Sequence, residues 1–356
     1  MKRAILILAL SLLALGVLGL AYVYHSEGGP DADQKGLLPV AADAPGTPSS
    51  ASPVIAKEQS DLVHQLPAGA SVIVYADVTQ LRASAFAKEL SALAPTSDQD
   101  PEYSAFVRAT GFDYSRDLDR AAMALWPRTA PTSVLVLAEG RFDPKKIESY
   151  ALQTGRLTIE SSHDIYDLPE QGSNRRIRFT FLAPNRLALA DGPALAAVLK
   201  PGSARNLDPA MSARVAQVSG AAIFSVARTE DLPQDIGLDE SRNAQLARML
   251  KSVRAITLAG QPAASDFNIA ANADCDSALD ALQLMTVLDG LRWMGRAALA
   301  DPKVQQQIGP QWRPLDELLK AASLTHSGKT LRLRAQLTEQ MLAQAAGPPS
   351  GKPPAN

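Results

Sequence analysis

Apolar residues near the start of the chain form one long run without a charge. Ala4 to Tyr24 spans 21 residues, which as a helix is about 31 Å long and matches the hydrocarbon core of a bilayer. Lys2 and Arg3 precede the run, so the positive-inside rule places the rest of the chain outside the cytoplasm, on the periplasmic side. Residues 1–25 are therefore predicted to be a transmembrane anchor, or a secretory signal cleaved after Ala21.

The segment after this run has no apolar period. Residues 26–61 are rich in Pro, Ala, Gly and Ser, which predicts a flexible tether with a reach of about 30 to 35 Å. Residues 347–356 have the same character and are predicted to be a disordered tail. The globular part is therefore expected between residues 62 and 346.

Strand-like and helix-like periods alternate from residue 62 onward. The β-branched stretch 71–78 predicts a strand, and apolar spacing across 81–93 predicts a helix. Two strands are predicted around the turn at 127–131, and Asp143 before Pro144 predicts the cap and first position of another helix. A meander and a short helix complete this unit, at 157–159, 165–168, 176–182, 186–190 and 193–199.

The second half of the chain repeats this order of elements. A strand is predicted at 221–228, a hairpin across 253–273, the longest helix at 277–299, and a final hairpin after it. The repeat rests on element order, because residue identity between the halves is low. We therefore predict an α+β fold whose antiparallel sheets carry helices on one face, built as two similar tandem units at 62–205 and 206–346.

Composition narrows the classes of function. The 35 Lys and Arg residues balance 37 Asp and Glu residues, so the chain lacks the basic excess of a nucleic-acid-binding protein. A single cysteine, Cys275, excludes an intramolecular disulfide and any multi-cysteine metal site. Aromatic residues make up 5% of the chain, which offers few rings for stacking on sugars or bases.

Three short motifs contain residue types that are used in catalysis or ligand binding. Residues 328–330 (Gly-Lys-Thr) resemble the end of a phosphate-binding loop, but Ser323 stands where that motif needs glycine, so a turn is predicted. Residues 161–164 contain serines, a histidine and an aspartate but no Gly-x-Ser-x-Gly elbow, and a turn is predicted there as well. Residues 274–276 (Asp-Cys-Asp) precede the longest helix, where carboxylates favour capping. No catalytic residue, cofactor or metal site is predicted.

Carboxylates near the predicted strand ends leave one enzymatic alternative open. Two of them at a suitable separation would serve glycoside hydrolysis, although spacing along the chain does not establish that separation. A carrier that holds a small apolar ligand between sheet and helices is a further alternative. The carboxylates concerned are Glu139, Asp143, Glu148, Asp164, Asp167 and Glu170.

Two segments are predicted to contribute to an interaction surface. Arg176 and Arg178 share one face of a predicted strand and Arg186 lies on the next, which would suit an anion or a head group, although charges on an exposed sheet face follow the same pattern. On the longest helix, Trp293 and Met294 widen the apolar side beyond what one sheet face needs. This indicates a second buried surface, against a later segment of the chain or a partner protomer.

The start of the globular part resembles a known group of proteins. Leu66 to Val78 follows the pattern LPxxxxVxVYxDV, and Gly140 to Phe142 forms a GxF strand-to-helix turn. This resembles exported, membrane-anchored bacterial proteins of unknown function with repeated α+β units. The resemblance implies the architecture and no catalytic residues. We therefore expect a membrane-tethered, non-enzymatic binding or envelope-assembly component, with a carboxylate-dependent hydrolase or a ligand carrier as alternatives. The expected partners are the membrane, through one N-terminal helix, and a protein or a second copy of the chain.

Overall fold

The computed structural model describes most of the predicted globular part. The predicted anchor, tether and tail lie outside the described residues. Within the described part, no helix is both long enough and apolar enough to cross a bilayer. The described residues are 62–86, 101–126, 133–169, 176–191, 194–199, 207–231, 251–264, 266–309 and 312–341.

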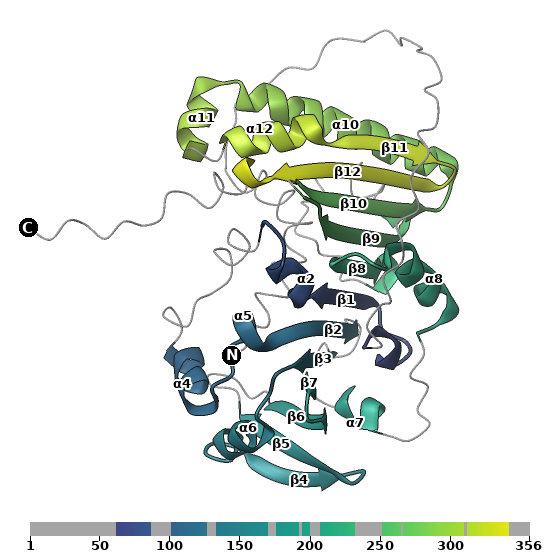
Figure 1. The fold of residues 1–356 in the computed structure, drawn as a ribbon. Helices are drawn as coiled ribbons and strands as arrows, with labels where there is room; N and C mark the ends of the chain where they lie inside the picture. Colours follow the sequence, from purple (N-terminus) through teal and green to yellow (C-terminus); the bar gives the residue numbers. More distant parts are fainter. Residues whose placement is uncertain are drawn as a thin grey trace, which may run out of the picture.

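Twelve strands of the described residues form one antiparallel sheet (Figure 1). Its order is β11-β12-β10-β9-β8-β1-β2-β3-β7-β6-β5-β4. The expected α+β class with antiparallel pairing is confirmed, and the strands of both halves belong to one continuous sheet. The strands are β1 (Val72–Asp77), β2 (Leu118–Trp126), β3 (Ser133–Gly140), β4 (Arg156–Glu160), β5 (His163–Pro169), β6 (Arg176–Ala183), β7 (Arg186–Asp191), β8 (Ile223–Arg228), β9 (Val253–Pro262), β10 (Asp266–Cys275), β11 (Ser323–Ser327) and β12 (Thr330–Thr338).

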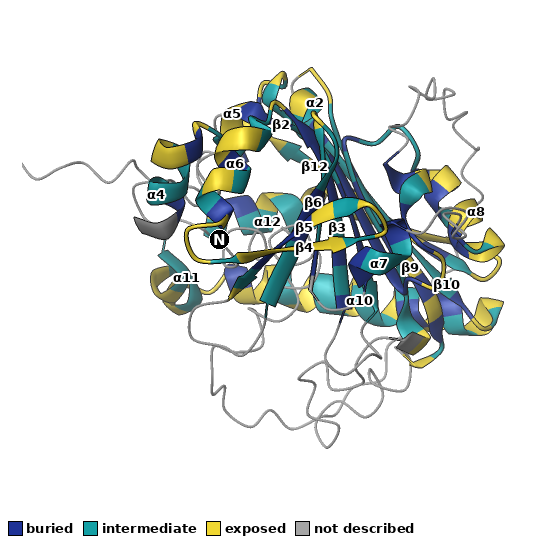
Figure 2. Cartoon of the chain, turned by 90° about the horizontal axis from the view of Figure 1, so that it is seen from below, coloured by how far each residue is buried: buried dark blue, intermediate teal, exposed yellow. Residues whose placement is uncertain are grey.

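Helices lie on both faces of this sheet, which corrects the expectation that they occupy one face (Figure 2). The short α7 and α8 cover one face, whereas α6 and α10 pack on the other. The helices are α2 (Val78–Arg82), α4 (Pro101–Thr110), α5 (Tyr114–Asp117), α6 (Pro144–Ala151), α7 (Ala194–Leu199), α8 (Pro209–Val218), α10 (Ala278–Leu299), α11 (Pro302–Ile308) and α12 (Trp312–Ala321), with 3-10 turns η1 (Val63–Gln65) and η2 (Thr229–Asp231).

The strand order is the same on both sides of the central pair β1 and β8. Outward from the centre, β1, β2, β3, β7 and β6 lie on one side, and β8, β9, β10, β12 and β11 lie on the other. On each side a later hairpin returns to pair with the third strand. The first half then adds the hairpin β4–β5, at the point in chain order where the second half has α11 and α12.

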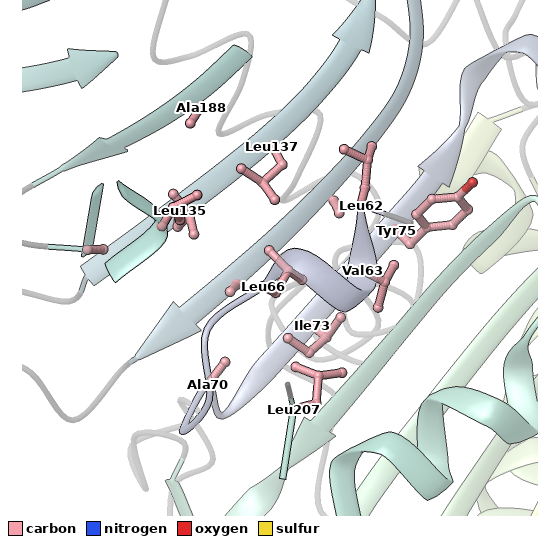
Figure 3. Packing of buried hydrophobic residues seen from close by; sticks show 14 of the residues in the cluster. Leu62, Val63, Leu66, Ala70, Ile73, Tyr75, Leu135, Leu137, Ala188 and Leu207 are labelled. Carbon is pink, nitrogen blue, oxygen red and sulfur yellow. The ribbon is translucent and has the colours of Figure 1, made fainter. Parts of the chain in front are cut away.

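The main core lies over the central strands and contains residues from both halves. Ile73 and Tyr75 of β1 face the same side as Leu66 and Leu135 (Figure 3). Phe224 of β8 stacks on Tyr75 with ring centroids 5.2 Å apart. Because β1 and β8 also pair through their backbones, the two halves share one core at the centre of the sheet.

The opposite face has two further apolar clusters, one beneath α6 and one beneath α10. Under α6, Ile147 packs on Tyr166 and Phe179, whose rings stack with centroids 5.0 Å apart. Under α10, Leu284 packs on Leu331 of β12. These two helices therefore cover the outer strands at opposite ends of the sheet.

Three helices, α6, α8 and α11, begin after an aspartate that precedes a proline. Asp143 caps α6 as predicted, by accepting a hydrogen bond from the Lys146 backbone N–H at 3.3 Å. Asp208 caps α8 by accepting a hydrogen bond from the Met211 backbone N–H, and Asp301 caps α11 by accepting one from the Lys303 backbone N–H, each aspartate being followed by proline. The same Asp-Pro signal precedes both of these helices in the sequence, where it was not used to predict them.

The helix predicted at 81–93 begins earlier than the apolar spacing indicates. Asp77 accepts a hydrogen bond from the Gln80 backbone N–H at 2.9 Å, so α2 begins at Val78. It ends at Arg82. Residues 83–86 form turns, so the predicted helix is wrong there, and its remaining part, from residue 87 onward, lies outside the described residues.

Candidate interaction surface

The long helix α10 begins at a side-chain cap. The Ser277 hydroxyl accepts a hydrogen bond from the Asp280 backbone N–H at 3.1 Å and donates one to the Asp280 carboxylate at 2.6 Å. A capping hydroxyl with an acceptor three residues later fixes where a helix begins. This corrects the expected capping by Asp274 or Asp276, because Asp276 pairs with Arg254 at 2.5 Å instead.

The inner side of α10 is accounted for by packing within the chain. Ala281 and Leu284 are buried against the sheet. Beside the sheet contact, α12 lies so close that a Cβ atom added to Gly295 would stand 3.3 Å from Leu319 Cδ1. Packing against α12 therefore explains the glycine at position 295.

The outer side of α10 leaves large apolar side chains in contact with solvent. Leu279 is 61% exposed, Leu282 40%, Trp293 71% and Met294 54%. Leu279, Leu282 and Trp293 lie on one helix face together with exposed smaller residues at intervals of three or four positions, and Met294 borders that face. We call the following six exposed residues the outer stripe: Leu279, Leu282, Thr286, Gly290, Trp293 and Ala297.

A depression of about 430 Å³ adjoins α10 where β11 begins. Its lining includes Met285 and Leu324, and Arg292 reaches across it to donate a hydrogen bond to the Ala322 carbonyl at 2.5 Å. Arg292 also pairs with Asp289 at 2.8 Å, as their spacing predicts. Asp289 is the one carboxylate in this lining, so the depression does not hold the carboxylate pair that glycoside hydrolysis needs.

The three arginines of the predicted basic strip are each paired with a carboxylate. They therefore present no excess of positive charge. The three side chains also do not form one cluster, because Arg178 pairs in register with Ala190, which is four positions along β7 from Arg186. Their strands, β6 and β7, belong to the half of the sheet that ends at β4, whereas α10 packs on strands of the other half. The pairs are Arg176 with Asp167 at 2.5 Å, Arg178 with Glu160, and Arg186 with Glu139 at 2.5 Å.

Arg186 belongs to a row of alternating charges that crosses four strands. Arg120 of β2 lies 3.6 Å from Asp77 of β1 and 3.5 Å from Glu139 of β3. Glu139, which is 8% exposed, also binds Arg186 of β7. We call Asp77, Arg120, Glu139 and Arg186 the charge ladder. Sequence reasoning missed it, because the alternation of charge appears only once the strands are paired.

A second polar cluster that sequence reasoning missed surrounds α5. The Tyr103 hydroxyl donates a hydrogen bond to Asp113 at 3.1 Å and accepts one from the Tyr114 backbone N–H at 3.0 Å. Burial raises the pKa of Tyr103. The hydrogen bond from Arg116 holds the pKa of Asp117 below its ordinary value. These contacts tie α4 to α5 and explain the cluster as structural.

Two of the three short motifs are turns, as predicted. Gly328 has φ 55° in the turn between β11 and β12, and Ser161 and Ser162 form the turn between β4 and β5 with φ 50° and 64°. His163 Nδ1 lies 2.9 Å from the Ser161 carbonyl oxygen. Burial raises the pKa of the Cys275 thiol, which disfavours a thiolate nucleophile. Among the described residues, no group of three or more His, Cys, Asp and Glu side chains is placed to hold a metal ion.

Comparison with known proteins finds matches among solved structures alone. No family model matches the chain, and no curated protein matches it. The chain is similar to TP0453 in its crystal form III, with 9% identity, 82% of this chain and 100% of that chain covered, and a TM-score of 0.46. Crystal form IV of TP0453 gives 10% identity, coverage of 81% and 97%, and a TM-score of 0.42.

Proposed function

We propose that this chain is a membrane-tethered, extracytoplasmic and non-enzymatic binding component of the cell envelope, which holds a protein partner on the outer side of α10. The N-terminal apolar run and the segment that follows it support the tether and its placement outside the cytoplasm. The equal strand order of the two halves supports their origin as two tandem α+β units. In this proposal the sheet is the rigid support on which α10 lies.

The exposed apolar side of α10 is the observation that carries this proposal. The inner side of the helix already packs on the sheet, so the fold does not require leucine and tryptophan on the outer side. Full burial of one large apolar side chain contributes about 1.5 to 3 kcal/mol. A partner that covers Leu282 and Trp293 would therefore gain binding energy without competing with contacts inside the chain.

Site-specific photo-crosslinking in intact cells tests the proposal. A photoreactive residue is placed at position 282 or 293 of the full-length protein, and at Lys303, an exposed residue of α11, as the matched control. We expect one discrete protein adduct from positions 282 and 293 and none from position 303. The proposal is wrong if positions 282 and 293 give no protein adduct, or if position 303 gives the same adduct.

A further inference from the structure

We infer that the partner on α10 is a second copy of this chain, whose own α10 packs antiparallel against the outer stripe. The inference rests on the proposed function, because it takes α10 as the docking surface. It goes further by naming the occupant and the register of the contact.

Gly290 is the first observation in favour of a second helix at this position. Glycine inside a helix is about 1 kcal/mol less favourable than alanine. At Gly295 the neighbouring Leu319 accounts for that loss, but a Cβ atom added to Gly290 would meet nothing within 4 Å. Packing within the described residues therefore does not explain Gly290. A second backbone that approaches α10 closely at this position does explain it.

The outer stripe is also complementary to the outer stripe of a second copy that runs antiparallel to it. Its spacing is symmetric about the level of Leu288. An antiparallel copy therefore places a larger residue against a smaller one at two levels, and two large apolar residues against each other at the third. A two-fold axis requires this kind of self-complementary patch on one chain. The opposed pairs are Leu279 with the partner's Ala297, Leu282 with the partner's Trp293, and Thr286 with the partner's Gly290.

Charge along the borders of the stripe is balanced, which disfavours a strongly charged partner. Asp289 pairs with Arg292 at 2.8 Å, and Arg296 lies 3.6 Å from Asp316 of α12. A patch of this kind presents no net field to an acidic protein or an anionic lipid surface. A neutral apolar helix of the same composition, such as α10 of another copy, suits it better.

The size of the patch indicates a reversible dimer. A helix of 22 residues is about 33 Å long and about 10 Å across, so one side projects about 330 Å². A standard interface buries about 800 Å² on each partner. Pairing of α10 alone therefore gives a weak contact in solution. Confinement of two tethered copies to one membrane raises their effective concentration and favours the contact.

Cysteine crosslinking tests the occupant and the register together. The one native cysteine, Cys275, is buried, so introduced cysteines are the accessible ones. Full-length Leu282→Cys and Trp293→Cys chains, each with its own tag, are co-expressed and oxidised in isolated membranes. Antiparallel pairing places position 282 opposite the partner's position 293, whereas two copies of position 282 stand about 18 Å apart along the helix axis. Lys303→Cys chains serve as the matched control.

We expect the mixed 282–293 disulfide to exceed the 282–282 and 303–303 disulfides at least tenfold. Gly290→Leu in both chains should abolish it, because the added side chain fills the line of contact. Leucine is a good helix former and meets open space in the single chain, so the fold should persist, as circular dichroism would verify.

Three other outcomes overturn the inference and differ in what they leave standing. A dominant 282–282 disulfide means that the copies do not pair antiparallel in this register. If no disulfide forms and the photo-crosslink reaches a different protein, self-pairing is wrong and the proposed function stands. If no disulfide forms and the photo-crosslink reaches only lipid, both are wrong.

Discussion

The charge ladder makes a quantitative prediction about stability. Glu139 lies between Arg120 and Arg186 and is 8% exposed. Glu139→Gln keeps the shape of the side chain but removes the charge that both guanidinium groups face. Removal of one partner from a fully buried ion pair costs about 3 to 5 kcal/mol. The Arg186 side chain keeps 22% exposure and Arg120 keeps 44%, so water screens part of the loss. We expect a destabilisation of about 2 to 3 kcal/mol.

Urea unfolding of the full chain in mild detergent, followed by circular dichroism, measures this loss as a lower midpoint at unchanged slope. Glu317→Gln is the matched control, because Glu317 lies 3.3 Å from Lys320 with both side chains about half exposed. Such a surface pair contributes about 0 to 1 kcal/mol. A second change, Arg186→Met, should restore part of the loss caused by Glu139→Gln, because the two residues interact. Equal effects of Glu139→Gln and Glu317→Gln would refute this account of the ladder.

Further substitutions probe other parts of the structure. Gly290→Ala should raise the free energy of unfolding by about 0.5 to 1 kcal/mol, whereas Gly295→Ala should gain less, because its Cβ atom would meet the neighbouring helix; thermal melts compare the two. Phe224→Ala should lower the free energy of unfolding by about 3 to 5 kcal/mol in urea titrations, because Phe224 is fully buried in the central core. The pKa of Asp117 is lowered in the fold, so its stabilisation is present above the unfolded pKa of about 3.9 and is lost as pH falls through the lower folded value. Asp117→Asn should reduce the loss of stability between pH 4 and pH 2, measured by acid titration of the circular dichroism signal, and unchanged steepness would contradict this assignment.

Helices, strands and turns could be predicted from the sequence wherever residues close together in the chain determine them. The β-branched run that ends at Asp77 predicted β1, and the Gly328 turn predicted the hairpin β11–β12. Asp143 before Pro144 predicted the start of α6, and the same dipeptide at Asp208 marks α8. These signals act within a few residues, so chain order alone is sufficient to read them.

Long-range pairing was not readable in the same way. β1 and β8 pair although Ile73 and Val226 are more than one hundred positions apart in the chain. This pairing joins both halves into one sheet. Along β1, successive residues are apolar, so the side chains on both faces of the strand must be shielded from water. Both faces of the central strand therefore carry apolar clusters, which the pattern of Val72 to Ala76 indicates only in retrospect.

The candidate surface was readable in part. Trp293 and Met294 stood out because the helix carried more apolar residues than one sheet face can bury, and the structure leaves both exposed. Arg176 and Arg178 were chosen by strand period alone, which cannot reveal that Asp167 and Glu160 lie within reach. An apolar excess is a property of one element, whereas a free charge depends on every neighbouring strand.

The edge strand β4 is the surface that competes with α10 for a partner. It leaves Ile159 74% exposed and Leu157 44% exposed, and it is the last strand in the sheet order. However, Arg156 and Glu160 stand at its two ends, and charges on an edge strand oppose the addition of another strand. The outer stripe of α10 is longer, carries no charge within it, and contains a glycine that its own chain does not explain. A partner therefore gains more contact on α10 than on β4, and burial of Trp293 rather than Ile159 is the change to expect on assembly.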